Sequence, residues 1–526
     1  MKKITFLLLS LLLSQWGIAQ IGILDTTFAD NGKYIFFDAN SDPLTYVSDA
    51  IIDNNGNILV SGNTSSPFAS SGGFVMKISQ NGVLIPGFGT NGILSFSGNP
   101  EIPGIIDCLA QKSDGNYTIL SSTWEGSTNT LTFYLNEISP DGQLIPGFGN
   151  GNNHFSVQGS VFSTAMKISP QGKTWVLFNM LNVPGTFTTS ANVYARQFNS
   201  DGTLNTSFGN SGLFEFGQDE PDDRCYDMAF DAEDNAYLTG NQRLTTSFGS
   251  LSTILTLCIN AGGQLESGFG NNGVFTYNDN VATFGSNSIE VLSNGDIILA
   301  GFRYEPFVAQ NSIIAKLNSN GEFISSFGNQ GILFTNLDGD DEMKSLQVLS
   351  DGRILVLGYV QSQNTDDDIF VGSFSMNGLP TPDFGNNGYT AAWDMDGGED
   401  KPKRILSSPD GGAVFCVGDG FSQGINLTIG EYGFILKYLN DIVSGIPGIE
   451  TQDYSIYPNP ATESFFINNY ESIVQLELLD ASGRMMLSKN GLSSNKLDLD
   501  FLSPGIYILK INTKDNRFLT RKIVKN

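Results

Sequence analysis

Hydrophobic and polar residues alternate in short runs over most of the chain, with a period close to two. Leu346–Leu349 precedes an Asp-Gly turn and Arg353–Leu357 follows it, and both runs have the length of a strand. A third run such as Ile313–Leu317 comes next, and a Phe-Gly pair leads into a fourth. This region shows no amphipathic helical pattern. The pattern therefore predicts units of four antiparallel strands rather than a helical or αβ repeat.

The four-strand unit recurs at intervals of 57 to 61 residues. Its first landmark is the Phe-Gly pair, in which we expect Phe to pack between sheets and Gly to bend the strand entry. A second landmark is a tight turn such as Asn55-Gly56 or Asp351-Gly352, where glycine tolerates the positive φ that the turn requires. The pairs are Phe88-Gly89, Phe148-Gly149, Phe208-Gly209, Phe269-Gly270, Phe327-Gly328 and Phe384-Gly385, after a degenerate Phe28-Ala29.

Incomplete units lie at both ends of the repeat region. The last quarter of a unit comes first, ending with the run Lys33–Phe37, and the first three quarters come last, ending with Phe434–Leu439. Together they make one whole unit. An open solenoid would need polar caps, whereas a ring hides its edges by pairing its first strand with its last unit. The sequence thus predicts an all-β fold, a seven-bladed β-propeller over residues 20–442 that is closed by the N-terminal strand.

The repeat carries a family resemblance. The segments Asp-Gly-Arg-Ile-Leu-Val-Leu-Gly (351–358), Asn-Ser-Asn-Gly (318–321) and Ser-Ser-Phe-Gly-Asn-Gln-Gly (325–331) resemble the delta-60 repeats, and the ring resembles NHL-type propellers. The resemblance extends from about residue 23 to 440. It implies the fold but no activity, because that family has no common catalytic motif.

A linker at 443–452 separates the repeats from a tail at 453–526, which reads as a small Ig-like β-sandwich. Its motifs closely resemble the type A C-terminal sorting domain of the type IX secretion system. The resemblance implies recognition by that machinery and delivery through the periplasm to the outer surface or the exterior of a Gram-negative bacterium; it leaves open whether the mature form is released or attached. The motif residues are Pro458, Asn459, Pro460, Gly483, Pro504, Gly505 and Tyr507.

The first 19 residues predict a signal peptide. Lys2 and Lys3 precede the apolar run Ile4–Leu13, and Gly17-Ile18-Ala19 supplies a small-x-small cleavage pattern. The apolar run is too short to span a bilayer, and no later run of about 18 to 20 apolar residues follows. We therefore expect no transmembrane segment.

Charge and composition narrow the chemistry. The formal net charge of −27 argues against nucleic acid and against an anionic membrane surface as partners. With a single histidine, His154, the sequence offers little for histidine-based catalysis, so an enzymatic activity stays open but unsupported. The four cysteines are widely spaced, and we expect them to be buried in strands, with a bond between Cys225 and Cys258 as the one alternative.

Candidate sites lie on the rim formed by the connections between strands two and three and between strands four and one, because these loops vary in length and content. Aromatic and arginine side chains there suit sugar rings or a protein partner. Acidic runs on the same rim suit Ca²⁺, although none has the EF-hand or RTX spacing. The ligand candidates are Trp124, Arg303, Tyr304 and Tyr359, and the Ca²⁺ candidates are Asp338, Asp340, Asp341, Asp394 and Asp396.

These observations favour a secreted or cell-surface binding or adhesion scaffold for a glycan or a protein. Two alternatives remain. One is a propeller hydrolase or lyase that uses the acidic residues of the rim, and the other is a purely structural surface protein.

Overall fold

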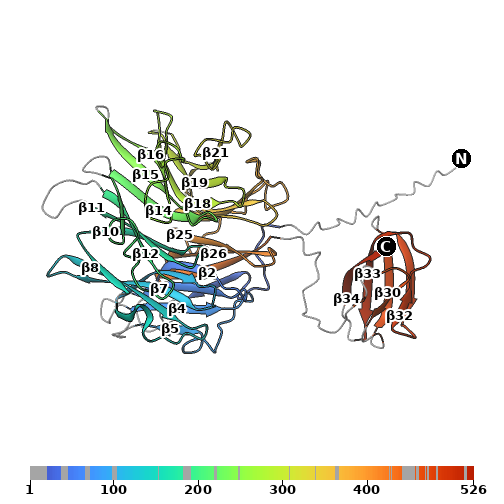
Figure 1. Cartoon of the computed structure of the whole chain (residues 1–526). Coiled ribbons are helices and arrows are strands. Elements are labelled where there is room, and N and C mark those ends of the chain that lie inside the picture. The colour runs from blue at the N-terminus through green and yellow to red at the C-terminus, as the bar shows by residue number, and fades with distance from the viewer. Residues whose placement is uncertain are drawn as a thin grey trace. The chain divides into compact units, whose positions relative to one another are not determined.

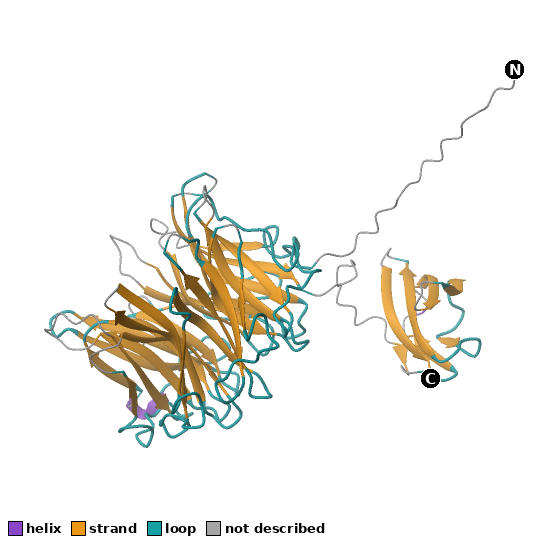
Figure 2. Ribbon diagram, turned by 90° about the horizontal axis from the view of Figure 1, so that it is seen from above, coloured by secondary structure: helices purple, strands orange, loops and turns teal. Residues whose placement is uncertain are grey.

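The chain divides into two compact units in the computed structural model, Met1–Asp441 and Ile442–Asn526. The structure describes residues 21–36, 45–64, 72–96, 104–151, 153–181, 191–217, 222–246, 249–306, 308–337, 339–361, 366–425, 427, 429–440, 456–457, 461–467, 470, 473–480, 484–514 and 518–525. The expected signal peptide lies outside these residues, as do Asp338, Pro458, Asn459, Pro460 and Gly483. Figure 2 shows strands throughout both units, with one short 3-10 turn, η1 (Phe148–Gly151), in the described part.

Seven antiparallel sheets form the described part of the first unit. In six of them the strands follow one another in the chain, and the seventh adds the first strand of the unit to its last three strands (Figure 1). The first four sheets are β2 (Thr45–Ile52), β3 (Ile58–Thr64), β4 (Gly72–Ile78) and β5 (Ile93–Ser95); β6 (Ile105–Gln111), β7 (Tyr117–Glu125), β8 (Thr130–Ile138) and β9 (His154–Gln158); β10 (Val161–Ile168), β11 (Thr174–Leu181), β12 (Ala191–Phe198) and β13 (Leu213–Phe216); and β14 (Asp222–Phe230), β15 (Ala236–Thr246), β16 (Gly249–Ile259) and β17 (Val274–Tyr277).

The remaining three sheets complete the unit: β18 (Thr283–Val291), β19 (Ile297–Tyr304), β20 (Asn311–Leu317) and β21 (Ile332–Phe334); β22 (Asp340–Val348), β23 (Ile354–Gln361) and β24 (Asp367–Phe374); and β25 (Asp400–Ser407), β26 (Ala413–Ser422) and β27 (Gly430–Leu439) with β1 (Lys33–Phe36). In the sheet of β22, β23 and β24, isolated bridges from Tyr389 and Trp393 to β24 occupy the place of a fourth strand. The unit has a β-propeller fold.

The first strand of the unit pairs with its last sheet. β1 lies antiparallel to β27, with Lys33 opposite Leu436 and Ile35 opposite Phe434. The first strand of each sheet also contacts the first strand of the next, and β25 contacts β2, so these strands surround a common axis. We call β2, β6, β10, β14, β18, β22 and β25 the inner strands.

The Phe-Gly pairs join neighbouring sheets. The phenylalanines are almost completely buried, apart from the half-buried Phe148, which confirms the expected packing. Each glycine has a positive φ and donates its amide hydrogen to a carbonyl of the following sheet, and Ala29 does the same in the degenerate pair. The bonds are Ala29 to Asn81, Gly89 to Asp141, Gly149 to Asp201, Gly209 to Gly262, Gly270 to Asn320, Gly328 to Asn377 and Gly385 to Ile21.

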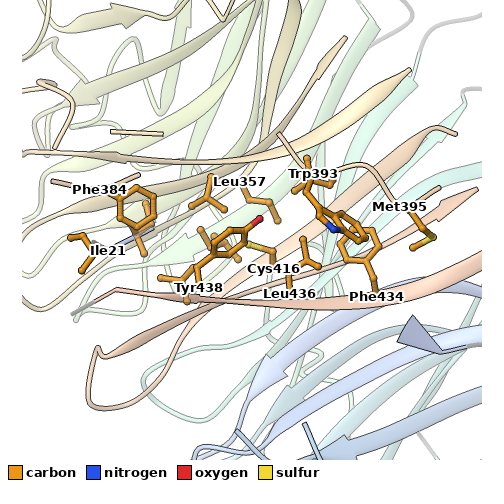
Figure 3. Close-up of a cluster of buried hydrophobic side chains, with 14 of the residues drawn as sticks. Ile21, Leu357, Phe384, Trp393, Met395, Cys416, Phe434, Leu436 and Tyr438 are labelled. Atoms are coloured by element: carbon orange, nitrogen blue, oxygen red, sulfur yellow. The ribbon is translucent and has the colours of Figure 1, made fainter. Parts of the chain in front are cut away.

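The hydrophobic core is divided into clusters between adjacent sheets. In one of them, Phe434, Leu436 and Tyr438 of β27 pack with Leu357 of β23 and with Trp393 (Figure 3). Many central strands are buried on both faces. Their sequences are therefore continuous apolar runs and do not alternate strictly between apolar and polar residues. All four cysteines are buried and free, as expected.

The C-terminal unit packs two antiparallel sheets around its own apolar core, which includes Phe465, Leu478 and Leu509. Tyr507 of the expected motif is buried, and its hydroxyl donates to the carbonyl of Ser503 at 2.8 Å. Among the described residues, no helix has the length and apolar character needed to cross a bilayer. The strands are β28 (Ile456–Tyr457), β29 (Ser464–Ile467) and β32 (Lys496–Asp498), and β31 (Met485–Asn490), β30 (Ile473–Asp480), β33 (Gly505–Thr513) and β34 (Phe518–Lys525).

Candidate functional site

A cavity of about 440 Å³ lies on the propeller axis, and all seven inner strands contribute to its lining. The lining residues belong to the half of each inner strand that leads into the glycine turn, such as Asp49–Ile52 before the turn at Asn55-Gly56. The cavity is therefore on the side of the repetitive turns, not on the variable rim. Its volume is in the range of small-molecule sites.

A β-bulge in each inner strand shifts the register close to the cavity. In five strands the bulged residue directly precedes the first residue of the lining. An extra residue twists the strand and changes the direction of the side chains that follow. The first lining residues after these bulges are Asp49, Asp227, Ser288, Ser345 and Arg404.

Arg404 and Asp49 form one ion pair beside the cavity, with 2.7 Å between Nε and Oδ1. The Asp49 side chain is 4% exposed and that of Arg404 is 26% exposed, so the cation reaches the cavity and the carboxylate lies behind it. Asp49 also accepts hydrogen bonds from the amides of Ala50 and of Leu109, which belongs to the next inner strand. The negative charge of Asp49 raises the pKa of Arg404 above its ordinary value.

Lys167 and Asp227 form a second pair, with 2.8 Å between Nζ and Oδ1 and side-chain exposures of 35% and 3%. Asp227 accepts further hydrogen bonds from Ser288 and from the amides of Met228 and Ile289. Burial raises the pKa of Asp227, but the charges of Lys167 and Arg404 and these donors outweigh it, and the pKa lies below its ordinary value.

Glu290 also lines the cavity, and its pKa is shifted in the opposite direction to that of Asp227. Glu290 accepts a hydrogen bond from the amide of Val348 at 2.8 Å, and burial raises its pKa to about 7. Gln347 contributes another polar group, since its buried Oε1 has no hydrogen-bond partner among the described residues. The cavity thus combines partly exposed cations, a carboxyl that can hold a proton near neutrality and an unpartnered amide oxygen.

The four ligand candidates from the sequence do not line this cavity. Trp124 and Tyr304 are exposed at the ends of β7 and β19. The Arg303 guanidinium pairs with Asp279 and Glu305, and Tyr359 on β23 donates its hydroxyl hydrogen to Glu342 at 2.7 Å. Arg303 and Tyr304 are neighbours, whereas the other two come from different sheets, so their role in binding stays a prediction.

The Ca²⁺ candidates from the sequence separate in the structure. Asp340 accepts from the amide of Gln310, and buried Asp341 accepts from the amides of Ser312 and Leu337 and from the hydroxyl of Thr335. Buried Asp396 accepts from Ser422 and from the amides of Ile425 and Leu427. These three carboxylates are held by loop and sheet donors.

Asp394 instead lies close to two aspartates that were not among the Ca²⁺ candidates, Asp368 and Asp400. One carboxylate oxygen from each of Asp368, Asp394 and Asp400 lies within 4.8 Å of the other two. We call these three residues the rim acidic cluster. The sequence shows the acidic runs at 366–368 and 394–400, but only the pairing of strands brings these members together.

Three axial residues share a regular spacing from the turn of their repeat. Asp49, Asp227 and Arg404 each stand seven residues before the second residue of their turns, Gly56, Asp234 and Gly411. The same position in the other four repeats holds Cys108, Ala165, Ser288 and Ser345, so an alignment of the repeats singles out these three charged residues.

Comparison with known proteins identifies the tail. The model of the secretion system C-terminal sorting domain family matches residues 455–526. The C-terminal unit is a type IX secretion sorting domain. The sorting domain directs the protein to the type IX machinery and so to the cell surface or the extracellular space. No curated protein matches the chain.

Solved structures with a similar fold are distant. A polysaccharide lyase of family PL25, an ulvan lyase, is 9% identical, with 76% of this chain and 95% of that chain covered and a TM-score of 0.41. The α-L-arabinanase of Penicillium chrysogenum, solved with arabinobiose, is 12% identical, with 64% of this chain and 94% of that chain covered and a TM-score of 0.37. Likenesses at this level carry no conclusion about activity.

Proposed function

We propose that this protein is a secreted binding scaffold whose propeller holds a hydroxyl-rich ligand, such as the end of a glycan, in the axial cavity. In this proposal the seven sheets are the blades of a ring of delta-60 type. The observation that carries the proposal is the axial cavity itself, in which partly exposed Arg404 and Lys167 stand in front of buried carboxylates.

The charges at the axis favour a neutral sugar over an ion. Arg404 and Lys167 are each matched by a carboxylate, so a charged ligand would have to compete with a pair that is already complete. Sugar hydroxyls both donate and accept, and they can bond to the free hydrogens of the two cations and to Oε1 of Gln347. The overall charge of −27 also repels acidic polymers at long range.

The rim candidates have a place in this proposal as secondary contacts. Exposed Trp124 and Tyr304 have the amphipathic rings that stack on sugars or anchor a protein partner. They would engage a longer chain or a second partner, independently of the cavity.

The test uses the full exported chain on a glycan array. Gln347→Met removes the amide but keeps the length of the side chain, and Gln143→Met makes the same change at an exposed turn. We expect Gln347→Met to weaken binding at least about tenfold, as loss of a buried polar contact does, and Gln143→Met to leave it unchanged. Equal binding by both variants would place the ligand outside the cavity.

A second candidate function is a glycan hydrolase or lyase, and one observation favours it. Glu290 and Asp227 line the same cavity with pKa values shifted in opposite directions, which is the arrangement that separates a general acid from an ionised carboxylate. A screen for released sugars would detect turnover, and Glu290→Gln should abolish it while binding persists. If turnover is lost in Asp340→Asn but not in Glu290→Gln, the chemistry belongs to the rim. A response in neither assay would favour a purely structural surface protein.

A further inference from the structure

The rim acidic cluster is assembled by strand pairing. Trp393 and Ile369 exchange two backbone hydrogen bonds, of 2.8 and 2.9 Å, in an antiparallel bridge. In an antiparallel pair the next residues on either side also face each other. Asp394 therefore lies opposite Asp368 of β24, although the two residues belong to different acidic runs.

The third member is brought in by a loop that folds back on itself. The amide of Met395 donates to Oδ2 of Asp400 at 3.0 Å, and Asp394 caps the turn by accepting from the amides of Asp396 and Gly397. Opposite Asp400 in the sheet stands Gly420, where a Cβ would lie 2.3 Å from Oδ1 of Asp400. The missing side chain at Gly420 leaves the space that the carboxylate occupies.

Asp400 lacks a partner for its second oxygen. Its exposed fraction is 0%, and Oδ1 accepts no hydrogen bond among the described residues. Neither Asp394 nor Asp400 forms an ion pair in the described part of the chain, and nearby Lys401 and Lys344 pair with Glu431 and Glu342. A buried carboxyl beside two others, without a cation, is costly unless something neutralises it.

We propose that Asp368, Asp394 and Asp400 bind one Ca²⁺ ion. The site is independent of the axial cavity and of any ligand held there. Asp396 is a positioning residue, because it fixes the loop through Ser422, Ile425 and Leu427.

The donor chemistry selects Ca²⁺ over other metals. All three side chains offer hard carboxylate oxygens, and neither histidine nor cysteine belongs to the cluster, which disfavours zinc and copper. Ca²⁺ accepts six to eight oxygen ligands in flexible geometry, so water and backbone carbonyls can complete the set, whereas Mg²⁺ demands a stricter octahedron. Extracellular modules bind Ca²⁺ at about 0.1 to 1 mM, which suits a protein delivered outside the cell.

The experiment uses Tb³⁺ as a luminescent substitute for Ca²⁺ on the full chain after treatment with EDTA. Trp393 adjoins Asp394 in sequence, so its excitation should sensitise bound Tb³⁺, and added Ca²⁺ should remove the emission. Trp393→Phe should lose the sensitised signal but keep the rise in Tm that Ca²⁺ causes. That combination would locate the ion next to this residue.

Three variants complete the test. We expect Asp400→Asn and Asp394→Asn to weaken Ca²⁺ binding at least about tenfold, because affinity follows the number of charged ligands. Asp340→Asn, which changes an aspartate outside the rim acidic cluster, should bind Ca²⁺ as the wild type does. Asp394 is exposed, so its variant gives a readout even if Asp400→Asn fails to fold. Wild-type affinity in Asp394→Asn, or no effect of Ca²⁺ on Tm together with no Tb³⁺ emission, would overturn the proposal.

Discussion

At the propeller axis Asp49 and Asp227 each face a cation and accept an amide hydrogen from the next inner strand, whereas at the rim Asp368, Asp394 and Asp400 face one another. The axial carboxylates are neutralised by the fold, and they also join neighbouring sheets. At the rim, neither Asp394 nor Asp400 has such a cation among the described residues. Acidic residues of one chain thus tie neighbouring sheets together in one place and form a candidate ion site in another.

The largest expected effect comes from breaking an axial pair. Asp49→Ala leaves Arg404 without its carboxylate and the amide of Leu109 without its acceptor. We expect a loss of about 3 to 5 kcal/mol in the free energy of unfolding, typical of a buried pair that loses one partner. Denaturant unfolding followed by the fluorescence of buried Trp175 measures it in the first unit. A change below about 1 kcal/mol, the range of exposed pairs, would contradict the comparison.

Glu290→Gln should change the pH dependence of stability. The pKa of Glu290 in the folded protein is about 7, above its ordinary value of 4.5, so its stabilising contribution is complete below pH 4.5 and is lost as pH rises to about 7. We expect the wild type to lose on the order of 3 kcal/mol over this range and the variant to lose less. Glu322→Gln, an exposed control, should follow the wild type. Parallel profiles for Glu290→Gln and the wild type would exclude this role.

A smaller effect is expected from filling the space beside Asp400. Gly420→Ala places a Cβ against Oδ1 of Asp400 and should weaken Ca²⁺ binding about tenfold, or about 1.4 kcal/mol, without any change in charge. Gly126→Ala is the matched control, since its Cβ would meet only Trp124 at 3.7 Å. Titration with Ca²⁺ measures both. Equal affinities would show that Asp400 can bind from another position.

The smallest effect on stability should come from Gln347→Met. The substitution removes a buried acceptor that has no partner, so unfolding should change by no more than about 1 kcal/mol. Glycan binding should nevertheless fall. Thermal unfolding and array binding, measured on the same preparation, separate these two results. A large loss of stability would mean that Gln347 holds the sheets together.

The repeat pattern was sufficient to predict the all-β fold, because alternation and turn glycines are local properties. The pairing of Lys33–Phe36 with β27 could also be anticipated, since the two incomplete units had to complement each other. Burial of Phe88 and its equivalents followed from the same repeat. Local sequence therefore carried most of the architecture.

The sites were harder to predict, because they depend on contacts between strands that are distant in sequence. Asp368 and Asp394 come from separate runs and meet only through the bridge at Trp393. Asp49 and Arg404 meet because the first and last sheets adjoin. A bulge adds one residue without a clear sequence signal, so the direction of Arg404 could not be read from alternation alone.

The pairing of Ile35 with Phe434 has a consequence for export. Nearly the whole propeller lies between these two residues in sequence. Because contacts between distant residues form more slowly than local ones, we expect β1 to pair with β27 after the hairpins have formed. A polypeptide that emerges from its amino end presents β1 as an unprotected edge until β27 is available. A chain that is truncated before β27 would leave this edge unpaired, and we expect such products to aggregate or to be degraded. Only a full-length propeller would close.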